Sequence, residues 1–107
     1  MIIQFGAAHH VKATEEFKAP LIGQLTEKLN RFKQHISRLE VHLADENGNK
    51  EGGNDKRCVL EAHIEGMPHV VVKSHANTYE QAVDGAVEKL IGSLHSMIGR
   101  LEAGQRN

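Results

Sequence analysis

The feature that most constrains this fold is an apolar stripe in the last long segment of the chain, Tyr79 to Leu101. Its apolar residues recur at steps of three and four, so at about 100° per residue they fall on one side of a helix. The stripe consists of Tyr79, Val83, Ala86, Val87, Leu90, Leu94, Met97, Ile98 and Leu101. Thr78 is placed to cap the first turn. We therefore predict a long helix with one face that the rest of the chain must bury.

The opposite side of this predicted helix carries Gly85, Gly92 and Gly99, which are spaced evenly and so align in one row. Each glycine costs about 1 kcal/mol relative to alanine inside a helix. The row is therefore either a seat for a closely approaching partner or a neutral feature of a helix that is held by its core.

The 107 residues allow one domain with a modest core, and we expect it to span 1–102, followed by a frayed tail, 103–107. The formal net charge of −1 gives no overall field for polyanions, so nucleic-acid contacts must depend on where the 13 lysines and arginines lie. A single cysteine, Cys58, fits a reducing compartment. Because the sequence shows neither a signal-peptide pattern nor a membrane-spanning apolar run, we expect a cytoplasmic protein with no membrane partner.

The first part of the chain predicts a short strand at Ile2 to Phe5 and then an amphipathic helix. Thr14 resembles a helix cap, yet Pro20 is tolerated only near the first turn, so regular helix should begin at about Glu16 to Lys18. We expect this helix to end at Gln34–His35. Its apolar face would consist of Leu21, Ile22, Leu25, Leu29 and Phe32.

Three later segments alternate between apolar and polar residues, which is the pattern of a strand with one buried face. They are Arg38–Ala44, Arg57–Glu65 and His69–His75. The predicted order is β-α-β-β-β-α, with the first two strands parallel across a right-handed crossover and the later strands antiparallel. We therefore expect an α+β fold in which two helices pack on one face of a four-stranded sheet and leave the other face uncovered.

Four histidines fall on the predicted uncovered face: His42, His63, His69 and His75. A zinc site needs three or four ligands that converge on one point, and the chain has no short metal-binding spacing. We expect solvated cross-strand pairs and no metal.

The sequence offers little to a catalytic mechanism. It contains no phosphate-binding loop, dinucleotide fingerprint or nucleophile-elbow motif, and Cys58 lies on the predicted inward face of a strand. The polar stretch from Asp45 opens like a calcium loop, but Lys50 and Lys56 replace the required glycine and glutamate. We therefore expect no enzyme activity, no cofactor and no calcium site.

Binding through surface charge is the remaining function class. Phosphate contacts by lysine and arginine would give salt-dependent affinity with little sequence selectivity. The predicted helices contribute Lys28, Arg31, Lys89 and Arg100, and the predicted sheet adds Lys56, Arg57 and Lys73. A solvated rim without a ligand remains the alternative for each of them.

Several segments resemble the ribosome hibernation-promoting factors, also called the ribosome-associated inhibitor or sigma-modulation protein family. They are Val11–Glu15, Lys28–Leu29, Arg38–Leu43 and Val83–Leu90. The resemblance extends from Ile2 to Leu101 and depends on the collinear order of the segments. It implies the same β-α-β-β-β-α fold, which is similar to that of double-stranded-RNA-binding domains.

The resemblance also implies a function: a non-catalytic bacterial stress factor that binds rRNA of the small ribosomal subunit in the channel for messenger and transfer RNA, and so inhibits translation. Lys28, Lys89 and Arg100 match basic positions of the family, and Arg31 and Lys33 are neighbouring candidates for rRNA contacts. The chain resembles the short form, which in the family acts with a separate partner to pair ribosomes.

The chain departs from the family in its last helix, where Gly92, Ser96 and Ile98 stand at positions for which we expect some basic residues. Each missing basic residue would weaken binding to phosphate groups. The alternative is therefore a protein-interaction module of the same fold, acting as a homodimer or as a seat for a partner helix. A histidine-dependent metal or pH sensor is a third hypothesis.

Overall fold

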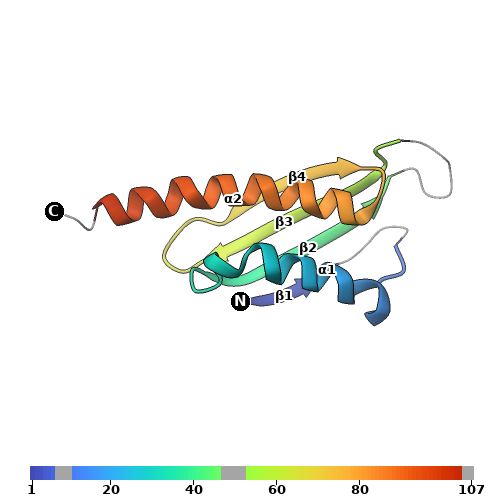
Figure 1. The fold of residues 1–107 in the computed structure, drawn as a ribbon, viewed down its shortest axis with the longest axis horizontal. Coiled ribbons are helices and arrows are strands. Elements are labelled where there is room, and N and C mark those ends of the chain that lie inside the picture. Colours follow the sequence, from blue (N-terminus) through green and yellow to red (C-terminus); the bar gives the residue numbers. More distant parts are fainter. Residues whose placement is uncertain (7–10, 47–52, 105–107) are drawn as a thin grey trace.

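The computed structural model describes residues 1–6, 11–46 and 53–104, and its elements follow the predicted order. The strands are β1 (Ile2–Phe5), β2 (Ile36–Asp45), β3 (Lys56–Ile64) and β4 (Val70–Ala76). The helices are α1 (Glu15–Lys28), the short 3-10 helix η1 (Asn30–Phe32) and α2 (Tyr79–Gly104). The predicted α+β fold class is therefore confirmed (Figure 1).

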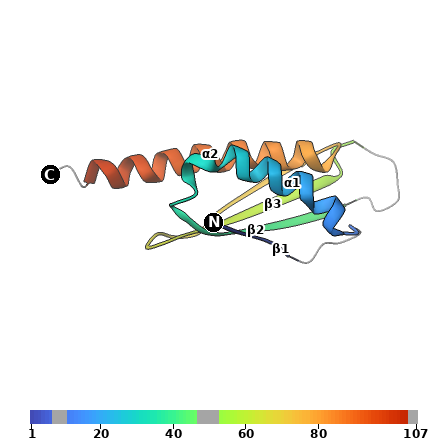
Figure 2. The ribbon, with the colours of Figure 1, turned by 60° about the horizontal axis from the view of Figure 1, so that its bottom comes forward.

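The four strands form one sheet in the order β1-β2-β3-β4. β1 pairs with β2 in parallel, and β2, β3 and β4 form an antiparallel meander, as predicted. The turn from β3 to β4 passes through Gly66, which adopts a φ of 75° that residues with a side chain rarely reach. Both helices lie on the same side of the sheet (Figure 2), so its other face is uncovered.

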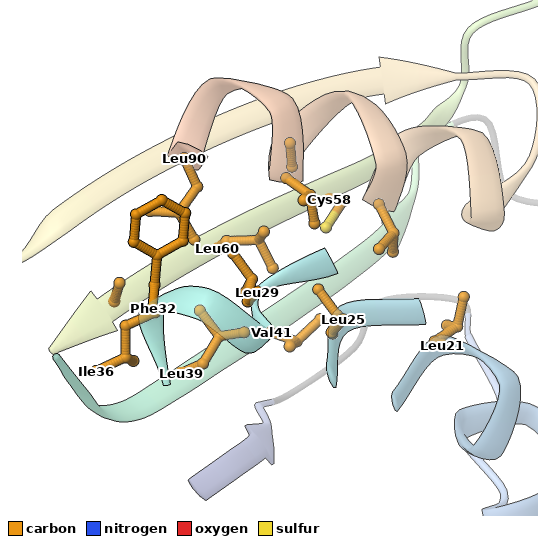
Figure 3. Close-up of a cluster of buried hydrophobic side chains, with 14 of the residues drawn as sticks. Leu21, Leu25, Leu29, Phe32, Ile36, Leu39, Val41, Cys58, Leu60 and Leu90 are labelled. Atoms are coloured by element: carbon orange, nitrogen blue, oxygen red, sulfur yellow. The ribbon is translucent and has the colours of Figure 1, made fainter. Parts of the chain in front are cut away.

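Alternation along the strands determines which side chains enter the core. In β2, Leu39 and Val41 are fully buried under the helices. Arg38 and Glu40 alternate with them along the strand, lie on the uncovered face and are half-buried. Figure 3 shows the resulting cluster, in which α1, η1 and α2 contribute side chains to one layer over β2 and β3. Its largest fully buried members are Leu21, Leu25, Leu29, Ile36, Leu39, Leu60, Leu90 and Leu94.

The predicted apolar stripe of α2 packs into this core. Val83, Val87 and Leu90 are fully buried, and the amide of Gln81 donates to Thr78 Oγ1 at 3.1 Å, which confirms the predicted cap. The last turns of α2 project past the sheet (Figure 1). Within the described residues, no helix combines the length and the apolar character that crossing a bilayer would require.

The boundaries of α1 differ from the prediction at both ends. The Phe17 amide donates to Thr14 Oγ1 at 3.1 Å, so the helix begins directly after this cap and Pro20 lies inside it. Pro20 is exposed, and its missing N–H removes one helical bond without burying an unpaired group. At the other end, the helix stops at Lys28 instead of Gln34–His35. The chain then forms the 3-10 helix η1, in which Phe32 is buried in the core, before β2 starts.

The predicted outward row of glycines is wrong for Gly85. This residue faces β4, where an added Cβ would overlap Ser74 Oγ and lie 3.2 Å from Ser74 Cβ. The close approach of helix and strand therefore requires glycine at this position, and no external partner is needed to explain it. Gly92 and Gly99 differ, because no described atom lies within 4 Å of an added Cβ at either position.

The different surroundings of Gly85 and Gly92 predict different effects of replacement by alanine. Gly92→Ala should raise the free energy of unfolding by up to about 1 kcal/mol, because alanine is the better helix former. Such a gain corresponds to a rise in Tm of about 4–8 °C for a domain of this size. Gly85→Ala should lose that gain to the overlap with Ser74. Thermal unfolding followed by circular dichroism measures both, and equal stabilisation by the two variants would contradict the packing of α2 on β4.

Candidate nucleic-acid interface

Lys28, the predicted basic contact of α1, lies at the seam between α1 and α2. Its ammonium group pairs with Asp84 and lies 3.9 Å from a carboxylate oxygen of Glu88. The hydrogen bond to Asp84 holds the pKa of Lys28 above its usual value. Asp84 and Glu88 are one helical turn apart, so both carboxylates face the same seam. The charge of Lys28 is therefore largely balanced by acidic residues of the same chain.

Lys56 and Arg57, at the start of β3, also have carboxylate partners. Lys56 Nζ donates to Asp45 at 2.8 Å and to Asp55 at 3.3 Å, and both of these acidic residues are buried. The hydrogen bond to Asp45 raises the pKa of Lys56. Arg57 Nε lies 3.6 Å from Glu46 Oε1. These two cations therefore satisfy acidic groups of this chain.

Arg31 reaches from η1 to the second half of α2. Its Nη2 donates to His95 Nε2 at 2.5 Å, and this nitrogen must be the acceptor because a guanidinium group only donates. The guanidinium lies 5.1 Å from the centre of the Phe32 ring, and the His95 ring meets the same ring edge-on. Lys33 is exposed, and in the described part of the chain neither Arg31 nor Lys33 pairs with a carboxylate.

An open groove runs between β4 and α2 on the side away from α1. Lys89 Nζ donates to the Lys73 carbonyl at 2.6 Å, which ties the helix to the strand. Arg100, three helical turns further on, lines the same groove, and so do the acidic Glu88 and His69, which directly precedes β4; the other lining residues are small or apolar. Across residues 1–6, 11–46 and 53–104, no carboxylate forms an ion pair with Lys73, Lys89 or Arg100.

The charges of α2 are thus segregated along the helix. Its acids Glu80, Asp84 and Glu88 precede Lys89, no acidic residue occurs from Lys89 to Arg100, and Glu102 follows in the last turn. We call the exposed basic groups beside the stretch from Lys89 to Arg100 the cationic flanks. They comprise Arg31 and its neighbour Lys33 on the α1 side and Lys89 and Arg100 on the β4 side. The Lys73 side chain is not among them, because it alternates with the inward-facing Ser74 and lies on the uncovered face of the sheet near Glu46.

Sequence reasoning missed three side chains that shape this surface: Asp84, Glu88 and His95. The spacing of Asp84 and Glu88 could have shown that one flank of α2 is acidic. Their partner could not be identified in this way, because Lys28 is 56 positions away from Asp84. His95 gives no comparable signal, since its role depends on where η1 places Arg31.

Other candidate chemistry lies elsewhere in the molecule. Cys58 is fully buried, and burial raises the pKa of its thiol to about 12, so it is not a thiolate at neutral pH. On the uncovered face, two groups of the described residues bring possible metal ligands within 4.8 Å of one another: Glu61, His63 and His69, and Glu40, His42 and Glu61. The centre of the loop that imitates a calcium site, 47–52, lies outside the described residues.

Comparisons with known proteins identify the family. Residues 7–102 match the family model described as "Sigma 54 modulation protein / S30EA ribosomal protein". The fold is similar to the N-terminal domain of Protein Y from Thermus thermophilus, with a TM-score of 0.68 and 17% identity over 91% of this chain and 99% of that one. It is also similar to a ribosomal subunit interface protein from Coxiella burnetii, with a TM-score of 0.66 and 18% identity over 92% and 99% of the two chains. No curated protein sequence matches the chain.

The pairing of Lys56 with two buried carboxylates predicts that it acts on stability. Lys56→Gln should lower Tm at pH 7, because it leaves Asp45 and Asp55 buried without the ammonium group. A raised lysine pKa contributes stability below the unfolded value of 10.5, and this contribution disappears as pH rises through the folded value. The difference in Tm between wild type and variant should therefore narrow above pH 10.5.

Lys33→Gln is the matched control, because it removes the same charge from an exposed side chain. Its free energy of unfolding should stay within about 0.5 kcal/mol of wild type. Equal effects of the two variants at pH 7 would show that Lys56 is an ordinary surface cation.

Proposed function

We propose, from the premise that this chain belongs to the sigma 54 modulation protein / S30EA ribosomal protein family, that it is a ribosome-associated hibernation factor. It would bind rRNA of the small ribosomal subunit in the channel for messenger and transfer RNA and inhibit translation without catalysis. The family match across residues 7–102 is the observation that carries this proposal. A separate ribosome-pairing factor and a cytoplasmic location belong to the same proposal.

The cationic flanks are the surface that supports an RNA contact. They border the stretch of α2 from Lys89 to Arg100, which contains basic residues and no acids, and they approach it from both sides. A phosphate near Arg31 or Arg100 would meet hydrogen-bond donors that pair with no described carboxylate, whereas Glu88 lies at the Lys89 end of the groove. Lys28, Lys56 and Arg57 support the proposal less, because acids of this chain already share their charge.

The charge distribution also sets the strength of the proposed binding. Affinity for a polyanion falls with salt in proportion to the number of phosphates neutralised. Because the cationic flanks are few and the net charge is −1, we expect a modest, salt-sensitive affinity. Shape complementarity of the helical face would then contribute a large share of the selectivity for the ribosome.

The alternative, a protein-interaction module, has one structural feature in its favour. A cavity of about 220 Å³ lies between α2 and the end of β3, and its lining combines the apolar Ile64, Met67, Met97 and Ile98 with the polar Gln34, His35 and Glu65. Gly85 no longer supports a partner seat, because Ser74 occupies the space beside it. Light scattering discriminates the two functions, since a tight dimer that covers the second half of α2 would prevent RNA from docking there.

Ribosome binding can be measured by co-sedimentation of the purified chain with small subunits across a salt series. Lys89→Gln and Arg100→Gln should each weaken binding, and each should reduce the slope of log K against log salt by about 1 for every phosphate that the variant no longer neutralises. The double variant should show the sum of the two changes if the two side chains act independently.

Lys12→Gln is the matched control for net charge, because Lys12 is exposed and belongs to the segment that leads into α1. In Figure 1 this segment lies at the opposite end of the molecule from the C-terminal end of α2. It should leave the salt slope of wild type unchanged. Absence of co-sedimentation even at low salt would refute the proposed function, and equally weakened binding by Lys12→Gln would refute the assignment of the cationic flanks.

A further inference from the structure

The uncovered face of the sheet carries a cluster of imidazoles and carboxylates that the proposed function does not use. The strand register places Glu40 of β2 opposite Glu61 of β3, and Arg38 of β2 opposite His63. One step beyond the last pair of β3 and β4, His63 and His69 meet with their ring centres 3.8 Å apart. The carboxylates of Glu40 and Glu61 are like charges on opposite strand positions, which destabilises a sheet. This pair therefore needs a positive charge or hydrogen-bond donors nearby.

The outer nitrogen of each ring faces a carboxylate. His63 Nε2 lies 2.5 Å from Glu40 Oε2, and His69 Nδ1 lies 3.3 Å from Glu61 Oε1. A carboxylate only accepts, so each of these nitrogens carries the hydrogen. Arg38 Nη2 is 3.2 Å from the same His63 nitrogen, but it donates to Glu40 at 3.3 Å and therefore does not require a lone pair on His63.

The inner nitrogens are then left facing each other. His63 Nδ1 and His69 Nε2 lie 2.9 Å apart. A neutral imidazole has one hydrogen, which here is on the outer nitrogen, so both inner nitrogens present lone pairs. Two adjacent nitrogens without hydrogens gain no hydrogen bond from each other, and a metal ion would give both lone pairs a partner.

The arrangement fits a metal ion. Metal-bound histidines usually donate the second ring N–H to a carboxylate, which is the role that Glu40 has for His63 and Glu61 has for His69. In a tetrahedral zinc site with Zn–N bonds of about 2.0–2.1 Å, two ligand nitrogens lie about 3.3 Å apart. The rings, whose centres are 3.8 Å apart in a tilted arrangement, must therefore swing apart so that both nitrogens point at one ion. A carboxylate oxygen of Glu61 lies within 4.8 Å of ligand atoms of both histidines.

Burial and charge are also suitable. The side chain of His63 is 14% exposed and that of His69 is 51% exposed, so one ligand is held firmly while the other leaves a path for the ion. Glu40 and Glu61 together outweigh Arg38 by one negative charge, which favours a cation at this point of the sheet.

We propose that the uncovered face binds a divalent transition metal ion of the zinc class through His63 Nδ1 and His69 Nε2. Glu61 serves as a third donor or as the orienting acceptor of His69, Glu40 orients His63, and water completes the coordination. This site lies on the face of the sheet opposite to the helices and reaches the edge of the sheet at His69, which also lines the groove beside α2.

The test is calorimetric titration of ZnCl2 into the full-length chain, purified without an affinity tag. Wild type should bind one ion per chain with saturation. His63→Gln and His69→Gln should each lower the affinity by at least about tenfold, and Glu40→Gln, which removes an outer-shell partner, by about 10–100-fold. His69→Gln is the safer variant, because its side chain is the more exposed and its removal should not impair folding.

Two controls separate this site from other histidines. His75→Gln removes an imidazole that also bonds to a glutamate on the same face, Glu46 at 2.8 Å, and should leave zinc binding unchanged. His9→Gln with His10→Gln removes the adjacent pair near the start of the sequence and should also leave it unchanged. Nitrogen-15 spectra of the imidazoles should show zinc shifting His63 Nδ1 and His69 Nε2.

No saturable zinc binding by wild type would overturn the proposal. Retained binding in both His63→Gln and His69→Gln, or abolished binding in the His9 and His10 variant, would also overturn it. These outcomes do not depend on ribosomes, so a failure here is distinct from a failure of co-sedimentation.

Discussion

Burial of one side of α2 against the sheet is the interaction on which the rest of this structure depends. Val83, Val87, Leu90 and Leu94 are fully buried, and they cover strands that α1 alone could not protect from water. Because both helices occupy the same side, polar groups are confined to two surfaces: the outer side of the helices and the uncovered face of the sheet. The cationic flanks lie on the side of the helices and the histidine cluster lies on the uncovered face, and the two surfaces meet at the groove that His69 shares with Lys89 and Arg100.

Periodicity made most of the fold predictable. Period-two alternation identified the buried face of β2, and steps of three and four identified the stripe of α2, because each pattern reports directly which side chains avoid water. The end of α1 was not predictable in this way. Leu29 and Phe32 continue the helical spacing, yet the chain leaves the helix so that β2 can begin at the buried Ile36. Gly85 was misread for a related reason: its close contact, Ser74, belongs to another element.

The site was less predictable than the fold, because it depends on pairs that are distant in sequence. The sequence identifies candidate cations but not which of them have acidic neighbours. Lys28 finds Asp84 through the packing of α1 on α2, and Lys56 finds Asp45 through strand register. What the sequence does show is the absence of acids from Lys89 to Arg100. For a nearly neutral protein this segregation matters more than the net charge, since local potential determines where a polyanion can approach.

The most direct test of ribosome binding through the cationic flanks is a cryo-EM structure of this chain bound to the small ribosomal subunit. We expect the second half of α2 to face rRNA, with Lys89 and Arg100 and the Arg31 side of the helix at phosphate groups. We also expect the histidine cluster on the uncovered face of the sheet to point away from that contact. A complex in which the uncovered face meets rRNA while the cationic flanks remain in solvent would contradict this mode of binding.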